Sequence, residues 1–170
     1  MDFEKLTDRS KELMQDVINL AAANRNQYIT PLHLLKVLLD DKNDLIVNLI
    51  LKAGGSITQI RDKVETAFAK LPQVAGSGVQ SLMSQDFTMV MMEAEKLADK
   101  SGDRFVTIER IFQALSMTSG NEAYDILTAS GVNAVKLNQV INEYRKGRIA
   151  DSESAEDNFE ALKKFTIDIT

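Results

Sequence analysis

The only histidine of the chain, His33, lies in the stretch "QYITPLHLLKVLL", beside a threonine and a proline. An imidazole moves protons near neutral pH, and with a hydroxyl or carboxylate partner it could support hydrolysis. Ser10, Asp40 and Asp44 are candidate partners, but their spacing singles none of them out, and no GxSxG nucleophile elbow occurs. We therefore interpret His33 as a structural residue in the first turn of a helix, and we expect no catalytic residue in this chain.

Other side chains that bind metals or nucleotides are scarce. The chain has no cysteine, which excludes thiolate sites and disulfides, and a single histidine excludes multi-histidine zinc sites. A nucleotide motor needs the pattern GxxxxGK[ST], which is missing, and the one Gly-rich loop, "AGSGVQS", lacks the lysine. We interpret this loop as a hinge, and we expect no metal and no cofactor in this chain.

Charge and hydropathy narrow the class of partner. The chain of 170 residues has 20 basic and 25 acidic residues, a net charge of -5, and no basic stripe that could follow a phosphate backbone. The N-terminal "MDFEKLTDRSKEL" is charged throughout, and no apolar run approaches the ~18 residues of a membrane span. We expect a monomeric cytoplasmic protein with neither nucleic acid nor membrane as a partner.

The chain repeats its apolar pattern after 77 residues. At this shift "YITPLHLLKVLL" lies over "FVTIERIFQALS" without a gap, so that Thr30 meets Thr107, and farther on Gly54 meets Gly131. Few of the pairs are identical, but the apolar positions recur, and these positions determine which face of each element is buried. The sequence therefore predicts two halves with one fold.

Each half predicts four helices. Thr7 and Thr30 are typical N-caps, Pro31 suits a first helical position, and Gly54 suits a helix end. The expected helices are 8–24, one from 31, 44–53 and 57–70 in the first half, and one after Ser84, one after Thr107, 121–130 and 134–146 in the second. We predict an all-α domain over 1–147, made of two pseudo-symmetric four-helix repeats at about 3–71 and 80–147.

The C-terminal residues 148–170 are predicted to be a linker. Residues 148–158 are small and acidic without an apolar face, which predicts mobility. The closing "NFEALKKFTIDIT" becomes apolar again, as expected at the beginning of another module.

The paired repeats, together with "ITPLHLL", "LPQVAG" and "ALKKFTIDIT", resemble the N-terminal domains of Clp ATPases over essentially the whole chain. The last two motifs are most similar to the disaggregase branch of that family. The resemblance implies a non-catalytic domain that binds exposed apolar segments of unfolded or aggregated polypeptides and passes them to a hexameric AAA+ motor. It also implies ATP and Mg²⁺ in motor modules outside this chain, and the DnaK chaperone system and the other protomers of the hexamer as partners. The alternative is an adaptor-docking domain of a ClpA- or ClpC-type protease partner, because one scaffold serves both uses.

The stretch "QDFTMVMMEAEKLA" is the candidate binding surface. Met89 and Met92 lie three residues apart on the helix face opposite its apolar stripe, to which Met91 belongs. Flexible thioether side chains adapt to varied apolar partners. Either the three methionines contact clients with their apolar neighbours, or another helix or the linker covers them.

Three polar residues match the family's pattern and complete the candidate set, namely Thr7, Asp103 and Glu109. Each also has a structural explanation, Thr7 as an N-cap, Asp103 as a turn or capping residue, and Glu109 as a negative charge in a helix first turn. Arg110 departs from the family's pattern, in which this position is often apolar.

Overall fold

The computed structural model describes residues 2–40, 44–76, 80–157 and 159. The elements of the first repeat are η1 (Phe3–Lys5), α1 (Asp8–Ala23), β1 (Tyr28–Ile29), α2 (Pro31–Leu39), α3 (Leu45–Lys52) and α4 (Ile57–Ala69). Those of the second are β2 (Leu82–Met83), α5 (Gln85–Lys100), α6 (Ile108–Met117), α7 (Glu122–Ala129) and α8 (Ala134–Arg145). The all-α class with two four-helix repeats is confirmed, and each helix whose two ends were predicted matches to within one residue.

The predicted cap residues explain this agreement. The hydroxyl oxygen of Thr7 accepts a hydrogen bond from the N–H of Ser10 at 3.2 Å, and that of Ser84 accepts one from Phe87 at 3.1 Å. Gly54 follows α3 with φ at 92°, in the left-handed region that glycine enters without a steric penalty.

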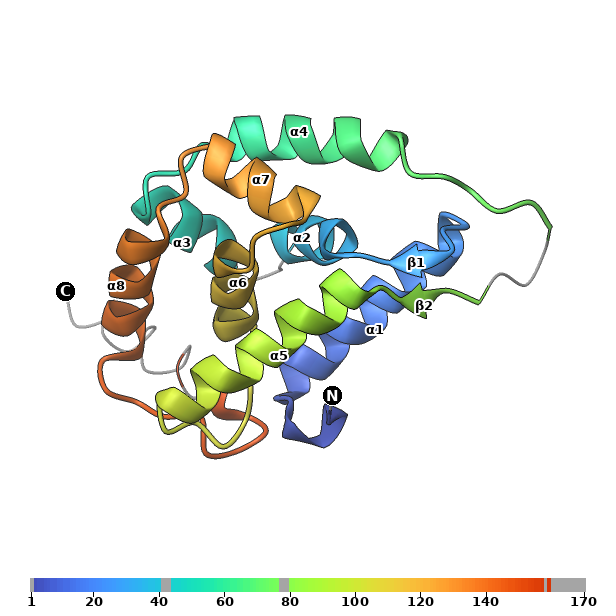
Figure 1. Cartoon of the computed structure of the whole chain (residues 1–170). Coiled ribbons are helices and arrows are strands. Elements are labelled where there is room, and N and C mark those ends of the chain that lie inside the picture. The colour runs from blue at the N-terminus through green and yellow to red at the C-terminus, as the bar shows by residue number, and fades with distance from the viewer. Residues whose placement is uncertain (1, 41–43, 77–79, 158, 160–170) are drawn as a thin grey trace.

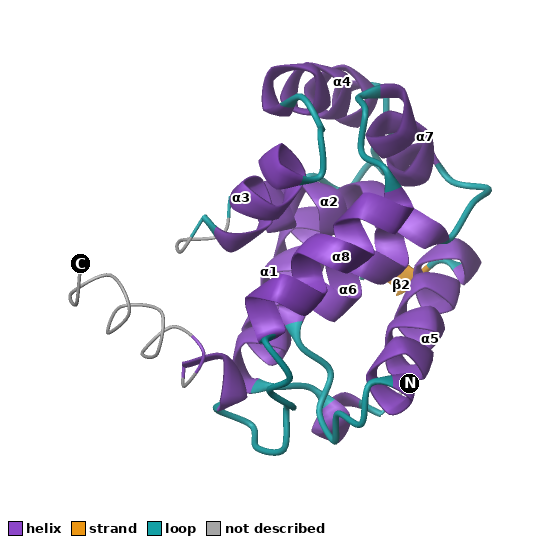
Figure 2. Cartoon of the chain, turned by 90° about the vertical axis from the view of Figure 1, so that its left-hand side faces the viewer, coloured by secondary structure: helices purple, strands orange, loops and turns teal. Residues whose placement is uncertain are grey.

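The two repeats share one core. In α2 and α6 nearly every side chain is buried, and one continuous apolar cluster includes residues from both repeats. In Figure 1, α2 and α6 lie in the middle of the molecule, with α4 and α7 at one end and α1 and α5 at the other. Figure 2 shows α4 and α7 together at the same end from the side. A helix buried on all sides must lie between layers, so the repeats form a single folded unit.

Short backbone pairings connect the repeats near the starts of α1 and α5. Strand β1 pairs in parallel with β2, with Ile29 opposite Met83, and an isolated parallel bridge joins Leu6 to Val106. The two pairings are equivalent at the 77-residue shift, since Ile29 corresponds to Val106 and Leu6 to Met83. The segment before the first long helix of each repeat therefore pairs with the other repeat. These strands were not predicted, because two residues are too few to show an alternating pattern.

The described residues after α8, which were predicted as part of a linker, contact both repeats. We call residues 148–157 together with Phe159 the exit segment. The carbonyl of Ala150 accepts hydrogen bonds from the N–H groups of Arg104 and Phe105, and the carbonyl of Glu153 accepts one from Asp8. The described residues after α8 therefore lie against the repeats. They do so through backbone hydrogen bonds and single buried side chains, which leave no periodic pattern in the sequence. Residues 158 and 160–170, with most of the closing apolar stretch, lie outside the described residues.

Candidate functional site

Met89 and Met92 form an exposed methionine face on α5. Their side chains are 48% and 51% exposed, whereas Met91, one position away on the helix, is 1% exposed. The predicted exposure of Met89 and Met92 is confirmed. The prediction that Met91 contacts a client is wrong for this structure, since Met91 points into the core with the apolar stripe of α5.

A groove of about 530 Å³ lies between α1 and α2. Apolar side chains such as Leu13, Val37 and Ile108 line part of it. Charged residues of both signs also line it, namely Arg9, Glu12, Asp16, Lys36 and Asp40. The groove was not predicted, because its walls come from helices whose relative placement the sequence pattern does not give.

His33 is held from both sides at the start of α2. The backbone N–H of Thr30 donates to Nδ1 at 3.0 Å, so Nδ1 carries no proton, and Nε2 donates to Oδ1 of Asn26 at 2.8 Å. Burial lowers the pKa of His33 to about 4, which keeps the ring uncharged at neutral pH. Both nitrogens are therefore used within the fold, and the interpretation of His33 as a structural residue is confirmed.

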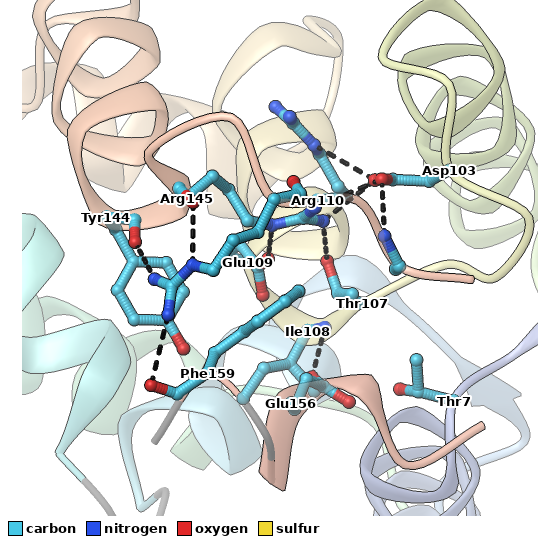
Figure 3. A network of polar contacts seen from close by, with 12 residues as sticks. Thr7, Asp103, Thr107, Ile108, Glu109, Arg110, Tyr144, Arg145, Glu156 and Phe159 are labelled. Carbon is cyan, nitrogen blue, oxygen red and sulfur yellow. Dashed lines mark hydrogen bonds and ion pairs between the residues drawn. The ribbon is translucent and has the colours of Figure 1, made fainter. Parts of the chain in front are cut away.

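The equivalent position in the second repeat contains a buried charged cluster (Figure 3). Arg145 at the end of α8 donates from Nη2 to Oδ2 of Asp103 at 2.7 Å and from Nε to Oε1 of Glu109 at 2.5 Å. The two carboxylates are fully buried and the guanidinium is 3% exposed. Thr107, the N-cap of α6, accepts a further bond from Arg145 at 3.1 Å. This cluster joins the end of α8 to the start of α6.

Charges within the cluster decide its protonation. Burial alone would lower the pKa of Arg145, but the hydrogen bonds and charges of Asp103 and Glu109 raise it above its ordinary value. Burial lowers the pKa of Arg110, and the positive charge of Arg145 acts in the same direction. Arg145 therefore stays charged and balances the two acids next to it.

Glu156 of the exit segment extends the cluster, and Figure 3 shows it below Ile108. Its Oε2 accepts a hydrogen bond from the backbone N–H of Ile108 at 2.9 Å, and so caps the start of α6. Glu156 is 1% exposed. Burial, and after it the negative charge of Glu109, raise the pKa of Glu156 to about 8. Sequence reasoning missed Glu156, and the available signal is Ile108, which has an N–H to satisfy where the equivalent Pro31 has none.

The three polar residues of the candidate set lie in or beside this cluster and not on the surface. Thr7, Asp103 and Glu109 are at most 5% exposed. Thr7 is the N-cap of α1, as predicted, whereas Asp103 and Glu109 are ion-pair partners of Arg145. They are inaccessible to a client in this structure, and direct contact by them is therefore a wrong prediction for the folded state.

Within the described residues, no three or more His, Asp or Glu side chains are arranged to hold a metal ion. Over the same part of the chain, no helix is both long and apolar enough to cross a bilayer.

Comparison with known proteins gives the family. Residues 5–130 match the model of the Clp repeat (R) N-terminal domain. The chaperone protein ClpB of Mesorhizobium japonicum is 45% identical over 170 residues, which are all of this chain and 20% of that protein. The chain thus spans about a fifth of the length of the curated relatives it matches.

Solved structures share the fold. The Hsp104 N-terminal domain from Candida albicans aligns with a TM-score of 0.78 at 20% identity, covering 89% of this chain and 98% of that one. A complex of the ClpV N-domain with a VipB peptide aligns with a TM-score of 0.64 at 19% identity, covering 82% of this chain and 86% of that one.

Proposed function

The chain belongs to the Clp repeat N-terminal domain family, and from this premise we propose that it is the substrate-recognition domain of a ClpB-type disaggregase. It binds exposed apolar segments of unfolded or aggregated polypeptides and performs no catalysis itself. The 45% identity to a ClpB chaperone over the whole chain supports this assignment.

The observation that carries the proposal is the pair of exposed methionines on α5. A half-exposed methionine on a folded helix costs hydration free energy that a bound apolar segment would recover. Because the thioether side chain is unbranched and polarisable, it adapts to segments of different shape. The peptide bound by the ClpV N-domain supports the capacity of this fold to hold a polypeptide segment.

A titration of the chain with an unfolded polypeptide tests this placement. Reduced and carboxymethylated lactalbumin is added to the labelled chain, and amide NMR shifts give the location and the dissociation constant. We expect weak binding with shifts centred on α5, and a Kd about 10-fold higher for the double variant Met89→Ser/Met92→Ser, from the lost apolar contact. Shifts that avoid residues 85–112 would refute the placement.

The matched control uses the first repeat. Glu12 and Gln15 occupy the positions of Met89 and Met92 at the 77-residue shift, so Glu12→Ser/Gln15→Ser changes the same sites of the other copy. This control is expected to leave the Kd for the unfolded polypeptide unchanged.

The groove between α1 and α2 favours a second candidate, docking of a folded adaptor. Its mixed charged lining could recognise one partner through complementary charges, which gives specificity that a promiscuous apolar surface lacks. Under this alternative, Glu12→Ser/Gln15→Ser weakens partner binding and Met89→Ser/Met92→Ser does not.

The remaining roles concern a longer protein of the ClpB type. We propose that the domain passes its clients to a hexameric AAA+ motor in the cytoplasm, whose modules bind ATP and Mg²⁺, and that other protomers and the DnaK system are its partners. Six domains on one hexamer would raise the effective concentration of weak sites, so that low affinity in the isolated chain is compatible with function.

A further inference from the structure

We propose that the exit segment is a releasable strap that closes over the starts of α1 and α6, and that the charge on Glu156 sets whether the strap is docked. This inference does not depend on which client or adaptor the domain binds. It gives the domain two states that differ in the path of the chain after α8.

The docked strap makes specific contacts with each element it crosses. The N–H of Ala150 donates to Oδ1 of Asp103 at 2.9 Å, and the carbonyl of Ala150 accepts from Arg104 at 2.8 Å. Farther on, the N–H of Asp8 at the start of α1 donates to the carbonyl of Glu153 at 2.8 Å. The strap is therefore positioned by the loop before α6 and by the start of α1.

Phe159 is the apolar anchor of the strap. The residue is 3% exposed and its ring lies close to two guanidinium groups, with Cζ of Arg145 4.9 Å and Cζ of Arg148 4.8 Å from the ring centre. Tyr144 packs edge-on at 6.1 Å. Among the described residues, Ala150, Ala155 and Phe159 form a small buried apolar cluster apart from the main core, and Tyr144 packs against both. An anchor of this size can be exposed without unfolding the repeats, because the core does not include it.

Two acids next to each other oppose docking. Glu109 and Glu156 lie in the same buried region, and each has one carboxylate oxygen, Oε2 of Glu109 and Oε1 of Glu156, without a hydrogen-bond partner. A proton on Glu156 removes one of two like charges and supplies a donor where none exists. The strap is thus most favourable when Glu156 is protonated, and it becomes strained when both acids are ionised.

The charged groups that face Glu156 come from every neighbouring element. Burial and the charge of Glu109 on α6 raise the pKa of Glu156, and they outweigh the N–H of Ile108, the nearby Thr7 and the charge of Arg9 on α1, which lower it. Arg145 on α8 is already paired with Asp103 and Glu109. The segment's own outer acids, Glu153 and Asp157, are bridged to Lys11 and Arg9 at the surface.

The direction of the pH dependence follows from these groups. A released Glu156 loses its proton near pH 4.5, while the docked carboxyl keeps it until about pH 8. The docked state therefore binds more protons over this range, and docking weakens as the pH rises through it. Release would give whatever follows Phe159 an additional reach of up to ~35 Å, the extended length of the freed residues.

Hydrogen exchange of single amides in the complete chain tests the strap. The reporters are the N–H groups of Asp8 and Arg104, which donate to carbonyls of the strap, and the N–H of Ala150 in the strap, which donates to Asp103. The reference is the N–H of Val106, which donates to the carbonyl of Lys5 and not to the strap. Between pH 5 and pH 8.5 we expect the protection factors of the reporters to fall by more than 10-fold relative to the reference.

Glu156→Gln is the decisive variant. Glutamine keeps an oxygen for the N–H of Ile108, carries no charge, and offers donors to the unpartnered oxygen of Glu109. We expect its reporter amides to stay protected at pH 8.5, with a flat profile. A wild-type profile that is already flat, or a Glu156→Gln profile that falls like the wild type, would overturn the proposal.

Two further variants separate charge from anchoring. Glu153→Gln removes an exposed acid from the same strap and should leave the pH profile of the wild type unchanged. Phe159→Ala removes the anchor and should lower the protection of the three reporters at both pH values while the reference stays protected. Full protection in Phe159→Ala would show that the strap is not held at this place and would also overturn the proposal.

Discussion

The start of the central helix is built twice in this molecule, with uncharged side chains in the first repeat and charged side chains in the second. The equivalent pairs, 77 residues apart, are Asn26 and Asp103, His33 and Arg110, and Phe68 and Arg145. In the first repeat His33 bonds to Asn26 and meets the ring of Phe68 edge-on at 5.7 Å. Three neutral side chains from one repeat therefore complete the start of α2.

The charged cluster of the second repeat depends on a residue from outside that repeat. Arg145 balances two acids, Arg110 cannot act as a capping acceptor, and the N–H of Ile108 is satisfied by Glu156 from beyond α8. The comparison teaches that one backbone can carry either a self-sufficient cap or one that depends on a distant segment. Only the second can be opened by moving that segment.

The outer surfaces of the repeats differ in the opposite direction. The second repeat has methionines where the first has polar residues, and the pairs are Glu12 and Met89, Gln15 and Met92, and Asp40 and Met117. Met117 is 44% exposed, similar to the other two methionines. The duplicated scaffold thus presents a polar copy and an apolar copy of one surface.

The largest effect is expected from removing the charge that balances the second cluster. Arg145→Met leaves Glu109 buried without its ion-pair partner and leaves Asp103 only Arg110, whose Nε lies 3.6 Å from Oδ2 of Asp103. This should lower the free energy of unfolding by about 3–5 kcal/mol. The equivalent change in the first repeat, Phe68→Leu, should cost less than about 1.5 kcal/mol. Denaturant unfolding measures both, and equal losses would contradict the contrast between the repeats.

The pH dependence of stability should separate the repeats next. The unfolded chain protonates His33 near pH 6.5, whereas the folded protein resists protonation down to about pH 4. The contribution of the uncharged ring is therefore present above pH 6.5 and is lost toward pH 4, by roughly 3 kcal/mol. Glu156 acts oppositely, and stability falls as the pH rises from 4.5 to about 8.

Two substitutions isolate these opposite responses. His33→Gln keeps an acceptor at the third helical position, so its unfolding free energy should depend less on pH between 4 and 6.5 than that of the wild type. Glu156→Gln should remove the decline between pH 6.5 and 8, where His33 no longer titrates. Unfolding curves at a series of pH values check both, and parallel curves for all three proteins would rule out the assignment.

A smaller difference is expected between the two equivalent N-caps. Ser84→Ala removes the capping oxygen of α5 and should cost about 1 kcal/mol. Thr7→Ala removes the cap of α1 and a fully buried hydroxyl that also donates to Ser10, so we expect about 2 kcal/mol. Thermal unfolding of the two variants gives the order, and a more costly Ser84→Ala would break it.

The smallest effect on stability is expected at the methionine face. Met89→Ser/Met92→Ser should change the unfolding free energy by less than about 0.5 kcal/mol, since both side chains are half exposed. Glu12→Ser/Gln15→Ser should behave alike. A large loss in the methionine variant would show that the pair supports the fold and would weaken its proposed role in recognition.

Much of the scaffold could be predicted from the sequence because its signals are local. Thr7, Ser84 and Gly54 act within one turn of the helix that each begins or ends, and the apolar pattern of each helix is recorded in its own residues. Because the apolar pattern recurs after 77 residues, the helices of the second repeat could be predicted from those of the first.

The charged cluster and the exit segment could not be predicted in this way. Glu156 stands in an acidic run, and its partner, the N–H of Ile108, is a backbone group that every residue type offers. Met91 was wrongly included among the client-contacting methionines, although helical spacing already placed it on the apolar stripe, where it is 1% exposed. The simultaneous change of Asn26, His33 and Phe68 to charged residues in the second copy was the available signal for a buried ion cluster.

The ties at the start of α1 bear on the order in which the molecule folds during synthesis. The N–H of Thr7 donates to the carbonyl of Val106, and that of Asp8 donates to the carbonyl of Glu153. Contacts between such distant parts of the chain form slowly, because a long loop must close first. A ribosome delivers α1 before any of these partners exists, so this helix is held in its final place only after the later segments of the chain have been made.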